Sequence, residues 1–274
     1  MSPLTLYMTA FYSIYRGYFR TALVVQFQYR VAMIIWLLGG IIEPVMYLVV
    51  WRTVAQQQGG AVGGYAVNDF VVYFIAIMLV EHGTFSWIMW EYDFRIRMGQ
   101  FSSQLLKPIH PIHSDIADNI GYKFLTLTVM APTAALLAWF FNASWQPDAR
   151  TLAIFVPVLL LAFLMRFFWE WSLAMLAFWT TRVDAINQAY FIVVLFFAGR
   201  LAPLELFPQF LQRVADFLPF RWMLAFPVEL LLGRLTPGEL WLGIAAQLFW
   251  LVAGYLVMQV VYRAGIRRYA AFGA

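Results

Sequence analysis

The chain has 274 residues, of which 63% are hydrophobic and only 12% are charged. A soluble domain has about 25% charged residues, and here too little polar sequence remains to cover an apolar interior, so the composition excludes a single water-soluble globule. The net charge of +4 comes from arginines near the ends of apolar runs, a pattern that is typical of membrane topology and gives no indication of a nucleic-acid partner.

The chain begins with an aromatic and arginine-containing segment, Pro3–Gln28, whose spacings are typical of an amphipathic helix, so we expect residues 1–30 to lie in the membrane interface. A membrane-spanning helix needs roughly 20 apolar residues to cross about 30 Å of hydrocarbon. We therefore predict an all-α polytopic membrane protein with one transmembrane domain over residues 1–274. Six segments qualify or nearly qualify as spans: Val31–Trp51, Phe70–Trp90, Phe124–Phe141, Leu152–Thr180, the short Ala185–Ala202, and Leu240–Tyr262.

Basic residues divide unevenly between the two sides of these spans. One side receives Arg16, Arg20, Arg30, Arg95, Arg97, Lys107, Lys123, Arg182, Arg263, Arg267 and Arg268, and the other receives Arg52, Arg150, Arg200, Arg213, Arg221 and Arg234. The richer side is expected to be cytoplasmic, which places both termini in the cytoplasm. Residues 91–123 then form the one substantial cytoplasmic loop, and the glycine-rich Gln56–Asn68 is interpreted as a flexible outside connector.

Residues 201–235 are apolar but repeatedly interrupted by proline. Between two of the prolines, apolar and polar residues recur every three or four positions, which predicts a short amphipathic helix with Phe210, Val214 and Phe217 packed on the spans. A second short helix, about Met223–Leu232, precedes Gly233. Helices of about ten residues cover only about 15 Å, so we predict a re-entrant hairpin on the outer side, with two interfacial helices lying flat as the alternative. The interrupting prolines are Pro203, Pro208, Pro219 and Pro227.

The cytoplasmic loop contains a second amphipathic pattern, which Pro108 and Pro111 end. Apolar side chains alternate there with basic and polar ones, which suits a short helix that docks into a groove of a partner protein. An ordinary interfacial helix between two spans would show the same periodicity. The candidate docking residues are Arg97, Phe101, Leu105, Leu106, Lys107, Pro108 and Ile109.

Four ionisable residues fall inside apolar runs, where each costs about 2.5–3.5 kcal/mol at mid-bilayer unless it is paired or faces water. Arg166 and Glu170 are four residues apart on one helix and predict a structural ion pair. Glu43 precedes Pro44, which should kink the first span, and Glu81 lies beside His82 in the second. We expect Glu43 and Glu81 to line a polar pathway. They would also suit a proton-coupled secondary carrier, although the inverted repeats common in such carriers are not visible.

Aromatic residues are expected mostly at lipid-facing or interfacial positions, among them Trp171. An outer subset could form an apolar gate. No nucleophile, base and acid arrangement emerges for an intramembrane enzyme. No metal site is expected either, since cysteine is absent and Pro111 separates His110 from His113. The gate candidates are Phe197, Phe207, Phe220 and Trp222.

The order of these parts resembles that of a known family. The residues that carry the resemblance are "GRLAPLELFPQFLQRVADFLPFRW" before the last span and "RMGQFSSQLLKPIHPI" in the cytoplasmic loop. Together with the N-terminal interfacial helix and the spans, they are similar to ABC-2-type permeases, the membrane subunits of ATP-binding-cassette exporters. The branch is the one whose members are encoded beside a separate ATPase, and the similarity covers nearly the whole chain.

The resemblance implies a bacterial cytoplasmic membrane protein in which two permeases, identical or homologous, pair around a central path through their first and fifth spans. Two copies of a cytoplasmic ATPase, each with ATP-Mg, would drive export of a lipophilic or amphipathic cargo, and the loop over residues 91–123 would couple to them. The chain itself lacks G-x-x-x-x-G-K-[ST], and its only lysines are Lys107 and Lys123. We therefore expect it to bind no cofactor and to catalyse no hydrolysis.

Overall fold

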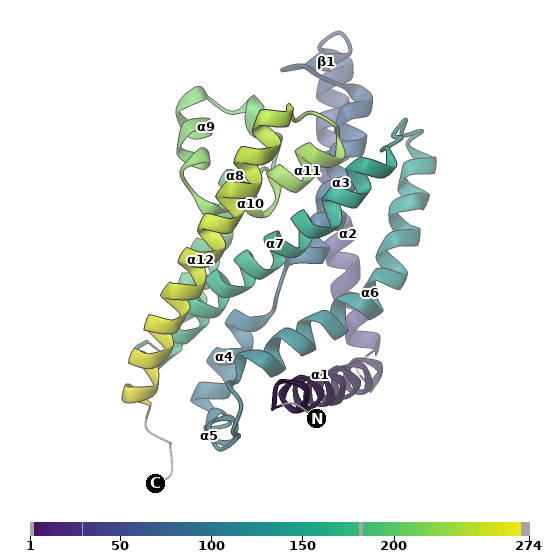
Figure 1. Ribbon diagram of the computed structural model, residues 1–274. Coiled ribbons are helices and arrows are strands. Elements are labelled where there is room, and N and C mark those ends of the chain that lie inside the picture. The colour runs from purple at the N-terminus through teal and green to yellow at the C-terminus, as the bar shows by residue number, and fades with distance from the viewer. Residues whose placement is uncertain (1–2, 29, 181–182, 270–274) are drawn as a thin grey trace.

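The structure is a computed structural model that describes residues 3–28, 30–180 and 183–269, and 81% of it is helical (Figure 1). Two short strands, β1 (Ala61–Val62) and β2 (Tyr65–Ala66), pair antiparallel. Two 3₁₀ turns are η1 (Met175–Phe178) and η2 (Leu204–Leu206). The helices are α1 (Pro3–Gln28), α2 (Arg30–Gln57), α3 (Val67–Thr84), α4 (Ile88–Arg97), α5 (Phe101–Leu105), α6 (Ile112–Phe140), α7 (Ala149–Ala174), α8 (Val183–Phe197), α9 (Gln209–Asp216), α10 (Pro219–Met223), α11 (Ala225–Leu231) and α12 (Pro237–Arg268).

Five segments within the described part of the chain are long and apolar enough to cross a membrane, and they overlap five of the six predicted spans. The remaining prediction, Ala185–Ala202, corresponds to α8, which has only 15 residues and ends at Phe197. At 1.5 Å per residue α8 covers about 22 Å, less than the hydrocarbon thickness. The chain is thus an all-α polytopic membrane protein. The five segments are Ile34–Gln57, Val67–Arg97, Ile112–Phe140, Ala149–Phe178 and Pro237–Arg268.

Different helices and strands lie at the two ends of the bundle. Figure 1 shows α1 lying across the end where α5 and the C-terminal end of α12 also lie, whereas β1 and α9 lie at the opposite end. α1 packs on α6, where Gly121 makes room for Ala22 because a Cβ on this glycine would come within 2.8 Å of the Ala22 Cβ. Tyr15 and His113 add a hydrogen bond of 2.8 Å between the hydroxyl and Nδ1.

The second span is broken, which the sequence did not predict. α3 ends at Thr84, Phe85 is extended, and α4 begins at Ile88. No proline causes this break. A carbonyl freed inside a membrane needs a new donor, and the Phe85 carbonyl accepts a hydrogen bond of 2.5 Å from Lys123 Nζ on α6. The predicted span over Phe70–Trp90 lies within the apolar segment Val67–Arg97, but this segment is interrupted, and a donor from another helix satisfies the freed carbonyl.

α3 is the central helix of the bundle. Its consecutive residues Phe70–Met78 are all buried, so its whole circumference is covered, and it packs against α2, α6, α7 and α11. A helix that is apolar on every side is typical of the interior of a membrane bundle. Glu81, which lies near the end of α3, is therefore placed among the other helices.

The proline-rich segment folds into short helices. Pro208 precedes α9, and Pro219 is the first residue of α10. The predicted second helix, about Met223–Leu232, corresponds to α11, and α10 is an additional short helix before it. Gly233 follows α11 with φ of 67°, and Thr236 and Glu239 form the capping box of α12. The predicted packing of Phe210 and Phe217 was wrong. These side chains are 72% and 81% exposed, because Ala215 forms the packed face of α9.

The glycine-rich segment before α3 is an ordered hairpin, so its interpretation as a flexible connector was wrong. Gly63 has φ of 56°, and a Cβ there would meet a Leu206 methyl group at 2.2 Å, so a larger residue would need a strained backbone and a shift of Leu206. The Arg234 guanidinium lies 3.6 Å from the centroid of the Tyr65 ring and donates to the Gly64 carbonyl at 2.9 Å. The hairpin is thereby attached to the segment that begins α12.

Candidate functional site

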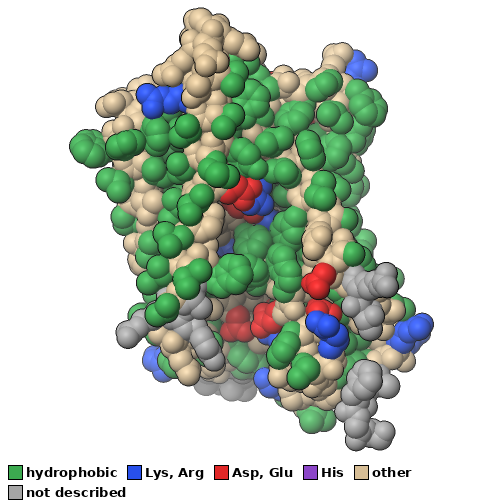
Figure 2. Space-filling view, turned by 180° about the vertical axis from the view of Figure 1, so that it is seen from behind, with side chains coloured by type: hydrophobic (Ala, Val, Ile, Leu, Met, Phe, Trp, Pro, Cys, Tyr) green, Lys and Arg blue, Asp and Glu red, His purple; other side chains and the backbone are tan. Residues whose placement is uncertain are grey.

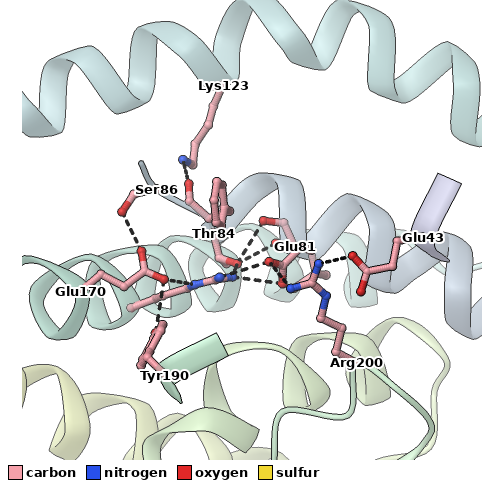
Figure 3. A network of polar contacts seen from close by, with 11 residues as sticks. Glu43, Glu81, Thr84, Ser86, Lys123, Glu170, Tyr190 and Arg200 are labelled. Atoms are coloured by element: carbon pink, nitrogen blue, oxygen red, sulfur yellow. Dashed lines mark hydrogen bonds and ion pairs between the residues drawn. The ribbon is translucent and has the colours of Figure 1, made fainter. Parts of the chain in front are cut away.

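Five ionisable side chains from four parts of the chain form one row inside the bundle (Figure 3). The row alternates in charge and runs from α2 through the turn after α8 to α3 and α7. Every neighbouring pair is an ion pair, with nitrogen–oxygen distances between 2.6 and 3.6 Å. The order is Glu43, Arg200, Glu81, Arg166 and Glu170.

Arg166 is the fully buried centre of this row. Its two terminal nitrogens each lie 3.1 Å from one oxygen of Glu81, and its Nε donates to Glu170 at 2.7 Å. A bidentate pair of this kind uses the planar guanidinium fork. Arg166 also donates to the Thr84 hydroxyl at 3.1 Å. The spacing of Arg166 and Glu170 indicated their contact, whereas nothing in the sequence indicated that Glu81 joins them from 85 residues away.

Glu170 is the inner end of the row. Its Oε2 accepts a hydrogen bond of 2.6 Å from the Ser86 hydroxyl in the break between α3 and α4. Its Oε1 accepts another, of 3.2 Å, from the Tyr190 hydroxyl on α8. The carboxylate is completely buried, so these donors compensate for the water it has lost. The break in the second span therefore brings Ser86 to the network.

Arg200 is held in place by the backbone of the turn that follows α8. Gly199 has φ of 76°, and a Cβ there would come within 2.6 Å of the Tyr73 hydroxyl, which donates to the Gly199 carbonyl at 2.6 Å. Trp51 donates to the Leu201 carbonyl at 2.9 Å on the other side of Arg200. Two neighbouring helices thus fix the turn, and Arg200 reaches Glu43 at 2.6 Å.

The outer end of the row reaches the surface. Side-chain exposure is 34% for Glu43 and 20% for Arg200, but only 1% for Arg166. Figure 2 shows acidic and basic side chains inside a hollow in a mainly apolar face. Two adjoining pockets of about 200 and 410 Å³ share Glu43, Phe85 and Arg200 as lining residues. We call this pair of pockets the charged hollow.

Lys123 lies beside the row but is not part of it. It is the third cation beside the three carboxylates, but it donates to the Phe85 carbonyl and lies 4.7 Å from the centroid of the Phe163 ring, without a direct contact to any carboxylate of the row. The directly contacting row thus has three acids and two arginines. The row therefore has one more carboxylate than it has arginines, and Glu43 is the end carboxylate that faces the hollow.

The four predicted gate aromatics do not form one cluster. Phe197 and Phe207 pack around Leu204, Ala215 and Ala225 at the base of α9. Phe220 and Trp222 belong instead to the main core. The indole of Trp222 is buried and donates to the Asp216 carbonyl at 3.3 Å.

The prolines of this region separate its short helices, and α11 carries a buried acid beside Pro227, Glu229. Burial raises the pKa of the Glu229 carboxyl, while Arg221 beside it lowers that pKa. The Nη2 of Arg221 lies 3.2 Å from Glu229, and the same guanidinium also pairs with Asp216. Pro203 precedes η2 and is buried.

The predicted docking residues in the cytoplasmic loop separate into two groups. Phe101 is completely buried, with its ring among those of Tyr92, Phe178 and Tyr269, so its assignment as an exposed docking residue was wrong. Leu105 is half-buried against the core, and Leu106 is 87% exposed. The group at the surface consists of Arg97 (paired with Asp93), Leu106, Lys107 and Pro108, with Ile109 half-buried.

A buried aspartate missed by sequence reasoning fixes this loop to the bundle. Asp115 on α6 accepts hydrogen bonds from the Tyr92 hydroxyl at 2.6 Å, from Arg95 at 2.7 Å and from the Trp171 indole at 3.0 Å. Trp171 is consequently buried, so its expected lipid-facing position was wrong. The group joins α4, α6 and α7 directly above α5. In the sequence, only the position of Asp115 near the start of an apolar run could have suggested that it anchors this loop.

Comparison with known proteins adds one match. A family model described as ABC-2 family transporter protein matches residues 41–273, which is most of the chain and includes the whole ion-pair row. No curated protein matches the chain. Within the described residues, no group of three or more His, Cys, Asp and Glu side chains could hold a metal ion.

Proposed function

The chain belongs to the ABC-2 family of transporter proteins, and from this premise we propose that it forms half of the transmembrane path of an exporter. ATP hydrolysis would take place on two copies of a separate cytoplasmic chain. The other half of the path would be a second permease, identical or homologous. The cargo would be lipophilic or amphipathic, and the membrane a bacterial cytoplasmic membrane.

The charged hollow is the observation that carries this proposal. Glu43 and Arg200 are partly exposed, and Figure 2 shows charged side chains in a hollow of a mainly apolar face. Hydrocarbon cannot solvate an ion pair, so a second protein or a water-filled path has to cover it. α2 and α8 border the hollow and are apolar enough to meet a partner. Their large exposed apolar residues are Val31, Ile34, Ile35, Trp36, Leu38, Ile42, Met46, Val49 and Val50 on α2 and Ile192 and Phe196 on α8.

A proton-coupled carrier is less well supported by the same residues. Glu43 is paired with Arg200, and Glu81 is paired with both Arg200 and Arg166. A proton relay needs carboxylates that can lose their charge. Here each protonation would remove the charge of one of the two carboxylates that an arginine contacts inside the bundle, which is costly.

A purification tests the function. The tagged chain, extracted gently from its own membranes, should bring an ATP-binding chain with it, and vanadate-sensitive ATP hydrolysis should belong to that complex. The same chain separated from its partner should hydrolyse no ATP, because it has no phosphate-binding loop. Hydrolysis by the lone chain, or transport by the lone chain driven by a pH gradient, would contradict the proposal.

The proposed topology has six spans, with α8 as the short fifth and α9–α11 as an outer re-entrant hairpin. The end that carries α1, α5 and the end of α12 would be cytoplasmic, as the distribution of basic residues predicts. The break in the second span and the short α8 would both lie beside the path, where irregular backbone is tolerated in membranes.

Introduced cysteines test this topology without background, because the chain has no cysteine of its own. A cysteine at the exposed Arg213 should react with an impermeant maleimide in intact cells. One at the exposed Ser103 should react only after permeabilisation. A cysteine at the buried Ala215 serves as the control and should react poorly in both cases. Labelling of Ser103→Cys from outside would invert the orientation.

A further inference from the structure

We propose that the charged hollow selects a lipophilic cation as its cargo. This inference rests on the proposed function, and it names the chemical class of the molecule that the path accepts. Three features of the described residues lead to it: the order of charges in the ion-pair row, the aromatic residues of the two pockets, and the unequal effect that a cation and an anion would have on the row.

The order of charges places an acid at the accessible end. Arg166 has a carboxylate on each side, and Arg200 likewise lies between Glu43 and Glu81. Each guanidinium is therefore shared by two acids, and Glu43 has only a share of Arg200. Lys123, the remaining cation, is turned toward the Phe85 carbonyl. A molecule that enters the hollow thus meets a partly exposed carboxylate whose charge is incompletely balanced.

Aromatic rings surround this carboxylate in both pockets. The smaller pocket is lined by Trp36, Trp87 and Tyr122, the larger by Trp90 and Phe191, and Phe85 lines both. Several of the rings contact one another, with centroids 4.7 Å apart for Trp36 and Trp87. Aromatic faces attract organic cations, and they do so more strongly where water is excluded.

Glycine leaves space for such a molecule. Gly39 and Gly40 line the smaller pocket, and a Cβ built on either meets no atom within 4 Å. The two pockets measure about 200 and 410 Å³, and together they fall within the range of drug-sized ligand sites. An aromatic-walled site of this size with one carboxylate suits a bulky cation with delocalised or shielded charge.

An anion would fit the same site poorly. An anion that bound Arg200 would compete with Glu43, which lies 2.6 Å from the guanidinium, and would lie beside a carboxylate of the same charge. A cation approaches Glu43 without breaking any pair of the row. Charge therefore discriminates between two molecules of the same size and hydrophobicity.

Tetraphenylphosphonium and tetraphenylborate test this discrimination, because they have nearly the same shape and opposite charge. Saturable binding to the purified chain in nanodiscs, measured by equilibrium dialysis against empty nanodiscs, should be found for tetraphenylphosphonium and not for tetraphenylborate. Equal binding of both, binding of tetraphenylborate alone, or binding of neither would overturn the proposal. This comparison uses the native chain and does not depend on how any variant folds.

A substitution at Glu43 tests whether tetraphenylphosphonium binds beside this carboxylate. Glu43→Gln should weaken tetraphenylphosphonium binding by at least about tenfold, since a charged partner is lost. Glu205→Gln makes the same change at an exposed glutamate outside both pockets and should leave binding unchanged. If the cation fails to bind while the chain still purifies with an ATPase, the cargo class is wrong and the proposed function stands.

Discussion

Leu106→Asp should abolish ATP-driven transport while leaving the permease folded and inserted in the membrane. The side chain is 87% exposed at the end of α5, so its replacement removes no contact from the core. If Leu106 enters an apolar groove of the ATPase, an aspartate there loses its hydration without gaining a partner, which costs several kcal/mol. We expect the ATPase to dissociate and transport to fall by at least about a hundredfold, because 1.4 kcal/mol corresponds to a factor of ten.

Two controls separate docking from folding. Ser103→Asp introduces the same charge at an exposed polar position of α5 and should retain more than half of the transport activity. Phe101→Asp places the charge among buried rings and should reduce the amount of folded protein in the membrane. Co-purification of the ATPase with Leu106→Asp, together with normal transport, would remove Leu106 from the coupling role.

Local sequence patterns predicted those parts of the structure that depend on neighbours in the chain. The capping box Thr236–Glu239 and the bounds of α1 followed from signals within a few residues. The contact between Arg166 and Glu170 followed from their helical spacing. Apolar runs longer than about 20 residues located five segments of spanning length, because crossing hydrocarbon requires them.

Contacts across the chain decided the features that sequence reasoning missed. The break after Thr84 has no proline, and it forms where Lys123 and Glu170 supply a donor and an acceptor from other helices. Phe101 and Leu106 are both apolar residues in the same amphipathic pattern. Only the packing of η1 and the end of α12 on Phe101 makes one of them core and the other surface. No local signal distinguishes them.

Arg166→Leu should be the most destabilising single substitution in the bundle. It leaves Glu81 and Glu170 side by side without the guanidinium that lies between them, and removing one partner from a buried ion pair costs about 3–5 kcal/mol. The apparent melting temperature in detergent should fall by on the order of 10 °C, and less folded protein should be recovered from the membrane. Arg213→Leu removes an exposed arginine from α9 and should change the melting temperature by only a degree or two.

We expect the lower melting temperature of Arg166→Leu to result from the changed charge of the ion-pair row, rather than from the changed side-chain shape alone. Arg166→Leu combined with Glu81→Gln and Glu170→Gln also removes the charges of the two carboxylates that Arg166 contacted, and it should recover at least half of the lost melting temperature. Arg166→Lys keeps the charge but cannot reproduce the bidentate contact with Glu81, because an ammonium group lacks the planar fork. Its melting temperature should lie between those of the wild type and of Arg166→Leu. If Arg166→Leu melts like the wild type, or if the triple variant is less stable than the single one, the ion-pair row does not hold the bundle together.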